Sequence, residues 1–180
     1  MLQVVVPEVE FFDDGSQKFI SIQETKLNLE HSLISLSKWE SKWHKPFLDD
    51  NDKTTEELVD YIRCMTINSN VDPKVYMGLT SNIVDSVNDY IHDSMTATWF
   101  NDKDNQNKSR QIITSEVLYG WMVQFGIPFE CEKWHLNRLI TLIRVCTINN
   151  SPKKKMPMKK VVEDRKALNE KRKQEMKTRG

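Results

Sequence analysis

Cys131 and His135 are the pair of side chains with the most evident capacity for chemistry. They stand four residues apart in a stretch that predicts a helix, so both would lie on one face, as two ligands of a metal ion do. A structural zinc site needs further paired ligands, and the other candidates are scattered: Cys64, Cys146, His31, His44 and His92. We therefore expect no metal site and interpret Cys131 and His135 as packing residues.

Groups suited to nucleophilic or acid–base catalysis are also sparse. Acidic pairs occur at residues 13–14, 49–50 and 56–57, but each falls in an expected turn or helix start, where solvation and capping account for it. The sequence contains no glycine-framed serine and only five glycines, and it lacks a glycine-rich phosphate loop. It thus favours a protein that is not an enzyme and carries no cofactor.

Apolar and aromatic residues are crowded in two segments, residues 118–123 and 134–146, beyond what one small helical core requires. The chain has five tryptophans and eight methionines, residue types that are favoured at protein interfaces. Most of them should form the core. The crowding predicts that part of these two segments faces a protein partner, with six candidate residues: Leu118, Trp121, Met122, Trp134, Leu139 and Ile143.

The charge of the chain is divided between two parts. Basic and acidic residues number 26 each, but residues 151–180 hold 12 basic and 4 acidic residues, which leaves 14 and 22, a net charge of −8, on residues 1–150. Such a tail could contact phosphate groups without sequence preference, but it lacks aromatic residues and includes acidic ones, which argues against nucleic acid as the main partner. The basic candidates are Lys153, Lys154, Lys155, Lys159 and Lys160.

Length and cysteine content describe a reduced protein with one main domain. A domain of about 150 residues forms a core that needs neither disulfides nor metal. The three cysteines are an odd number among apolar neighbours, which indicates free thiols in a reducing compartment. The N-terminus lacks the basic start of a signal peptide, and no apolar run is long enough to span a membrane. We expect a cytoplasmic protein.

The elements that would position these residues are mostly helices. The exception is at the start, where β-rich runs at residues 8–12 and 18–22 flank a turn at residues 13–16 and predict a hairpin. An isolated hairpin is marginal in water, so it should pack on the body. The expected fold is mainly α: a helical domain with an N-terminal β-hairpin over residues 1–150, and a basic helical tail over residues 151–180.

Local signals place the helices. Thr54 and Glu57 form a capping box, Asp72 precedes Pro73 as an N-cap, and Gly126 is a helix end. Residues without any apolar side chain, 101–109, predict an exposed loop. Together with apolar spacing these signals predict helices over residues 29–43, 54–65, 73–79, 81–91, 110–125 and 130–147, and over residues 161–177 in the tail.

Four segments resemble proteins encoded among the tail genes of long-tailed bacteriophages. They are residues 29–43 (LEHSLISLSKWESKW), 60–66 (DYIRCMT), 95–98 (MTAT) and 129–139 (FECEKWHLNRL). The likeness extends from about residue 11 to the C-terminus and includes the lysine-rich junction at residues 152–155. On these residues the chain resembles the tail assembly chaperone family of siphovirus-type phages.

The resemblance implies a small helical protein without catalytic activity, acting in the host cytoplasm. Members of that family bind the long tape measure protein and help deliver it to the tail tube protein, so these two proteins are the expected partners. Two other functions stay open. One is a virion structural protein, such as a head–tail connector or tail component, and the other is a nucleic-acid-binding accessory protein that uses the basic tail.

The resemblance also implies two product lengths, because many members are made in two forms by programmed ribosomal frameshifting. Lys153, Lys154 and Lys155 are written in AAA or AAG codons, and three AAA codons would form a slippery run. A change of frame there would keep residues 1–150 and exchange only the tail.

Overall fold

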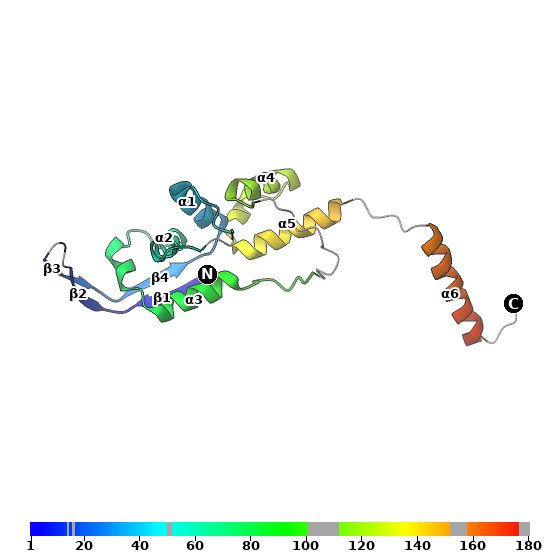
Figure 1. Cartoon of the computed structure of the whole chain (residues 1–180), viewed down its shortest axis with the longest axis horizontal. Coiled ribbons are helices and arrows are strands. Elements are labelled where there is room, and N and C mark those ends of the chain that lie inside the picture. The colour runs from blue at the N-terminus through cyan, green and yellow to red at the C-terminus, as the bar shows by residue number, and fades with distance from the viewer. Residues whose placement is uncertain (14, 16, 50–51, 101–111, 152–157, 177–180) are drawn as a thin grey trace. The chain divides into compact units, whose positions relative to one another are not determined.

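The structure is a computed structural model that describes residues 1–180 except residues 14, 16, 50–51, 101–111, 152–157 and 177–180. The chain forms two compact units, Met1–Cys146 and Thr147–Gly180. Helices predominate among the described residues (Figure 1), which confirms the expected mainly α fold class with a small N-terminal β element. The loop expected at residues 101–109 lies outside the described residues.

The N-terminal β element is a long two-stranded ribbon rather than one short hairpin. Its outer part pairs β2 (Val9–Asp13) with β3 (Lys18–Ile22), as the β-rich runs predicted. The ribbon continues inward as β1 (Leu2–Val6) paired with β4 (Thr25–Leu29), two strands that the sequence-based expectations lacked. Alternate side chains of this inner part enter the core, as the period of two in a strand requires: Val4, Val6, Leu27 and Leu29.

The outer edge of β4 is covered by the segment that follows Met65. The Glu30 N–H donates to Met65 O at 2.9 Å, and the Ile67 N–H donates to Asn28 O at 2.9 Å. The Asn68 side chain extends this pairing, since its Oδ1 accepts from the Asn28 N–H at 2.6 Å. An uncovered strand edge is a site for unwanted pairing, so these hydrogen bonds protect β4.

Helices α1 (Leu33–Trp43) and α2 (Thr55–Met65) each begin with a capping box. The box of α2 consists of Thr54 and Glu57, as the sequence predicted. The N-cap of α1 is Ser32, so the expected helix start at residue 29 was wrong. Residue 29 belongs to β4 instead, because its side chain completes the buried face of that strand.

A 3-10 helix, η1 (Pro73–Gly78), and helix α3 (Ser81–His92) follow close to their predicted starts. Asp72 is the N-cap of η1, as predicted. Gly78 ends η1 against the ribbon, where a Cβ atom would lie 3.0 Å from Val6 Cγ1. The missing side chain thus lets the ribbon pack closely on η1.

Helix α4 (Ser115–Phe125) begins later than the predicted residue 110, and residues 112–114 are not helical. Its N-cap residue, Thr114, makes no capping hydrogen bond with its side chain. The helix ends at Gly126 as predicted, and this glycine takes the left-handed conformation with φ 64° that terminates many helices.

The single helix expected over residues 130–147 was wrong. The structure has a 3-10 helix, η3 (Phe129–Lys133), and then helix α5 (Leu136–Asn150). The chain is extended between them, and His135 forms an isolated β-bridge with Ser32. Tertiary contact with the start of α1 therefore interrupts a stretch whose local apolar spacing suits a helix.

The core of the first unit draws on the ribbon and on most of the helices. Trp39 joins α1 to α2, because its indole N–H donates to Glu57 O at 2.9 Å. The Trp39 ring also meets Phe47, with ring centroids 5.0 Å apart. The largest other apolar side chains with less than 2% exposure are Tyr61, Leu27, Leu29, Leu33, Leu36, Met65, Leu118, Met122, Leu136 and Leu139.

The second unit contains the last residues of α5 and the helix α6 (Met158–Met176). A tail helix was predicted over residues 161–177, and α6 begins three residues earlier. Several of its apolar side chains are exposed, namely Val162, Leu168 and Met176. Helix α5 continues to Asn150, so the boundary between the two units at Thr147 falls within this helix, whereas the sequence placed the end of the first domain at residue 150.

Candidate functional site

The outward face of α4 presents apolar side chains to solvent. Tyr119, Gly120 and Val123 share this face because residues three and four positions apart are neighbours on a helix. Val123 is 66% exposed, and Phe129 of η3, next to this face, is 56% exposed. The rings of Tyr119 and Phe129 lie 6.4 Å apart, which joins α4 and η3 into one patch. These four residues are called the α4 surface below.

Tyr119 is held in place from one side. Its hydroxyl donates a hydrogen bond to Glu132 Oε2 at 2.9 Å, between α4 and η3. Burial raises the pKa of Tyr119 to about 12, and the hydrogen bond to the Glu132 carboxylate adds to this effect. The hydroxyl therefore stays protonated near neutral pH, and the ring keeps a defined orientation in the α4 surface.

The fold does not require a glycine at position 120. Apart from its chain neighbours and the backbone of its own helix, no atom lies within 4 Å of the position that its Cβ would take, and its φ angle is not in the left-handed region. A glycine inside a helix lowers stability by about 1 kcal/mol relative to alanine. Since neither packing nor backbone conformation requires it, Gly120 leaves an open notch beside Tyr119 and Val123.

Acidic residues border the α4 surface. Glu116 lies one turn before Gly120 on the same face and is exposed, Glu130 of η3 is exposed, and Glu132 is half-buried. The basic residue of η3, Lys133, lines a different cavity beside Lys38 of α1. The patch is therefore apolar at its centre and acidic at its rim.

Four of the six predicted partner-binding residues lie in the core. Leu118, Met122 and Leu139 are fully buried, and Ile143 is 4% exposed. They lie on the sides of α4 and α5 that pack on the core of the first unit, so the prediction that these four residues face a partner was wrong. The other two, Trp121 and Trp134, are half-buried, and the Arg138 guanidinium stacks over the Trp134 ring at 4.3 Å.

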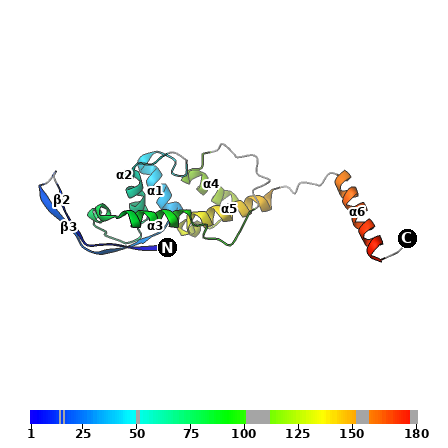
Figure 2. The same cartoon turned by 60° about the horizontal axis from the view of Figure 1, so that its bottom comes forward.

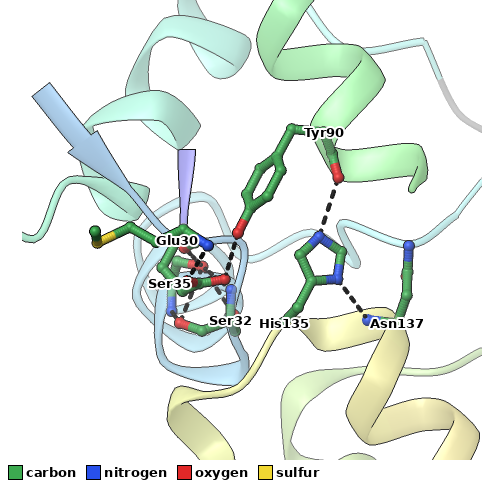
Figure 3. A network of polar contacts seen from close by, with 7 residues as sticks. Glu30, Ser32, Ser35, Tyr90, His135 and Asn137 are labelled. Carbon is green, nitrogen blue, oxygen red and sulfur yellow. Dashed lines mark hydrogen bonds and ion pairs between the residues drawn. The ribbon is translucent and has the colours of Figure 1, made fainter. Parts of the chain in front are cut away.

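His135, which the sequence places four residues after Cys131 as a possible metal ligand, belongs to a buried polar network (Figure 3). Its Nε2–H donates to Tyr90 O at 3.0 Å, and its Nδ1 accepts from the Asn137 N–H at 3.3 Å. The Tyr90 hydroxyl in turn donates to Glu30 Oε1 at 2.6 Å. These contacts use both ring nitrogens of a neutral imidazole and tie α3 and α5 to the end of β4.

A second buried histidine lies beside His135. The His31 ring is edge-on to the His135 ring with centroids 5.1 Å apart, and His31 Nδ1 lies 2.6 Å from the Tyr61 hydroxyl. Burial, with the neighbouring His135 adding to it, lowers the pKa of His31 to about 3. Burial likewise lowers the pKa of His135. Both histidines are structural, and neither lies with Cys131 on a common helical face.

The basic candidates of the tail fall in two places. Lys153, Lys154 and Lys155 lie outside the described residues, and Lys159 and Lys160 lie in the first turn of α6.

Among the described residues, no group of three or more histidine, cysteine, aspartate and glutamate side chains is placed to hold a metal ion. None of the described helices combines the length and the apolar character needed to cross a membrane.

The sequence predicted only part of the α4 surface. The segment 118–123 was identified, and Tyr119, Gly120 and Val123 lie in it, but Phe129 was not singled out. Its exposure depends on η3, a 3-10 turn with no strong local signal. Comparison of the chain with protein-family models, with curated proteins and with solved structures found no match.

Proposed function

We propose that this protein is a phage tail assembly chaperone that binds apolar helices of the tape measure protein through the α4 surface. It acts by binding, without catalysis, in the host cytoplasm, and the tail tube protein receives the delivered tape measure protein. The observation that carries the proposal is the exposed apolar patch of Val123 and Phe129 beside the notch at Gly120. Phe129 also opens one of the segments that resemble this chaperone family.

The shape of the α4 surface suits a helix as the ligand. An amphipathic helix lays its apolar face on a hydrophobic surface through side chains spaced three and four residues apart. The notch at Gly120 lets the backbone of such a helix approach α4 closely, as a glycine does wherever backbone meets ligand. Tyr119 and Val123 would then contact its apolar side chains.

The acidic rim favours a ligand helix whose apolar stripe is flanked by lysine or arginine. Glu116 and Glu130 are exposed beside the patch, so they can meet basic side chains and speed the encounter. The same carboxylates repel phosphate groups, which argues against nucleic acid at this surface.

Replacing Val123 with aspartate tests the proposal. The change places a charge at the most exposed side chain of the α4 surface, so we expect the dissociation constant for the tape measure protein of the same phage to rise by roughly 10- to 100-fold. Co-purification from cells that express both proteins, followed by titration calorimetry with a soluble helical fragment, measures the change.

Val162 offers a matched control, because it is an exposed valine on another helix. Val162→Asp should bind as the unsubstituted protein does. The thermal unfolding of both variants should stay unchanged, since neither side chain is in the core. Equal binding by Val123→Asp and Val162→Asp would remove the α4 surface from the proposal, and the half-buried Trp121 and Trp134 would be the next positions to replace with polar residues.

Gly120→Ala should separate folding from binding. The free energy of unfolding should rise by up to about 1 kcal/mol, because alanine is the better helix former and the added methyl group meets nothing. Binding to the tape measure fragment should weaken by several-fold, because the methyl group keeps the ligand helix away. Urea unfolding and calorimetry on one preparation provide both values. A more stable variant with unchanged affinity would show that the ligand does not approach closely at Gly120.

A structural component of the tail is the second candidate function. The observation that favours it is the exposure of Phe12 and Phe19 in the outer part of the ribbon. A neighbouring protein in the assembled particle would cover these two side chains permanently. Mass spectrometry of purified virions distinguishes the two functions, because a chaperone is absent from the finished particle and a component is present in stoichiometric amount.

A further inference from the structure

The tip of the ribbon exposes a pair of phenylalanines. Phe12 and Phe19 lie opposite each other in β2 and β3, with rings 5.1 Å apart in an edge-to-face arrangement, and they are 44% and 72% exposed. Figures 1 and 2 both show this part of the ribbon extending beyond the helices of the first unit. A two-stranded hairpin is marginal in water, so an aromatic pair left in solvent at its end indicates a contact outside this chain.

The ribbon is also strongly acidic. Residues 8–24 include five acidic side chains and a single lysine. Glu8, Glu10 and Glu24 are all exposed. A surface that receives this ribbon therefore needs an apolar floor for the two rings and basic side chains beside it.

The same chain provides an apolar groove between α2, η1 and α3. Its cavity has a volume of about 560 Å³. Met77 of η1 lines it and is 61% exposed, a large apolar side chain without cover. The other apolar side chains of the lining come from all three elements and the turns beside them: Val59, Pro73, Tyr76, Leu79 and Val84. This cavity is called the α2–η1–α3 groove below.

The lining of the groove also includes charged side chains, two of them basic. Lys42 and Arg63 line both the groove and an adjoining cavity of about 400 Å³, where Lys38 joins them. Asp60 also lines both, but its carboxylate is engaged by Lys42 Nζ at 2.5 Å and by the Trp43 indole. Only Glu56 adds another acidic group to the lining. Over both cavities Lys38, Lys42 and Arg63 stand against Asp60 and Glu56, a slight basic excess on a body whose net charge is −8, and Lys38 and Arg63 are the groups that can meet the acidic ribbon.

We propose that the ribbon of one copy inserts Phe12 and Phe19 into the α2–η1–α3 groove of a second copy. In the chain's own fold Phe19 remains 72% exposed, so its own groove does not receive it. The ribbon of the second copy can then enter the groove of the first, which closes a two-fold dimer, or the groove of a third copy, which builds a ring or a filament. This contact does not involve the α4 surface and does not depend on the chaperone function.

Two variants test the contact from its two sides. Phe12→Ser combined with Phe19→Ser removes the aromatic tip, and Met77→Asp places a charge in the groove. The side chains are exposed, so both variants should keep the thermal unfolding of the original protein. Light scattering should show a mass that rises with concentration for the unsubstituted protein. Each variant alone should associate at least about tenfold more weakly.

An equal mixture of the two variants gives the decisive measurement. The intact groove of the ribbon variant meets the intact ribbon of the groove variant, and the remaining faces are blocked, so the mixture should form a one-to-one dimer and nothing larger. Continued association of Met77→Asp by itself would indicate ribbon-to-ribbon pairing and overturn the proposal. The proposal would also be overturned if the unsubstituted protein stayed monomeric at all concentrations, or if the groove bound a different protein and not the ribbon.

Salt and a control at the α4 surface complete the test. Association should weaken as ionic strength rises, because Lys38 and Arg63 would face an acidic ribbon. Val123→Asp should associate as the unsubstituted protein does, since Val123 is in neither the ribbon nor the groove. Loss of association in this control would place the contact elsewhere and contradict the proposal.

Discussion

Replacing Glu40 with alanine is expected to lower the free energy of unfolding by about 3 kcal/mol. The Glu40 side chain is 7% exposed, and its Oε1 accepts from the Phe47 N–H at 3.0 Å. Its Oε2 accepts from the Ser115 N–H at 2.7 Å. Alanine would leave both N–H groups buried without an acceptor. Denaturant unfolding followed by circular dichroism measures the loss.

Glu40 does for α4 what a local N-cap does for other helices. Thr114 makes no capping hydrogen bond, so Glu40 of α1 provides the acceptor at the start of α4, where the helix dipole favours a negative group. Glu40→Gln keeps one acceptor and should lose about half as much stability as Glu40→Ala. Glu56→Ala, at an exposed position in α2, should change stability by less than about 0.5 kcal/mol. Equal stability of Glu40→Ala and the unsubstituted protein would contradict this role.

Acidification is expected to destabilise the fold from about pH 6.5 downward through His31 and His135. Burial lowers the pKa of His31 to about 3 and also lowers the pKa of His135, so the unfolded chain binds more protons than the folded chain below the ordinary histidine pKa of about 6.5. Stability is therefore complete above that pH and is lost as pH falls. At pH 5.5 the loss through His31 is about 1.4 kcal/mol, and His135 adds to it in the same direction.

The hydrogen bonds around His135 give this prediction a structural basis. Its Nδ1 accepts from the Asn137 N–H, and a second proton on the ring would remove that acceptor. Urea unfolding between pH 8 and pH 5 measures the dependence, a range above the titration of most carboxylates. His31→Asn should lower stability at pH 8 but reduce the pH dependence. His44→Asn, at an exposed helix end, should leave the dependence unchanged, and an unchanged slope in His31→Asn would contradict the prediction.

Elements that depend on local signals could be predicted from the sequence. The capping box of Thr54 and Glu57 starts α2, Asp72 caps η1, and Gly126 ends α4, each as expected. The outer hairpin also followed from its β-rich runs. In these cases residues within a few positions of each other satisfy the backbone groups of a helix end or turn, so the sequence contains the whole interaction.

Elements that depend on distant pairing could not be predicted in the same way. β1 and β4 are too far apart in sequence for a turn signal to join them, and their pairing becomes evident only with their common buried face. The break between η3 and α5 follows from the contact of His135 with Ser32, 103 residues earlier in the chain. Local apolar spacing predicted one continuous helix there, because spacing does not report such a contact.

The candidate site shows the same division. Apolar crowding indicated the segment of α4, but it did not distinguish the buried Leu118 and Met122 from the exposed Val123, since α4 is apolar on nearly all sides. The packing of α4 on the core buries Leu118 and Met122 and leaves Val123 exposed. Glu40 is the clearest example, because its buried carboxylate accepts from the N–H of Ser115, 75 residues away. The sequence by itself determined where helices and turns begin and end, because those hydrogen bonds are local, whereas tertiary structure decided which side chains remain exposed, because burial depends on surfaces brought together from distant parts of the chain.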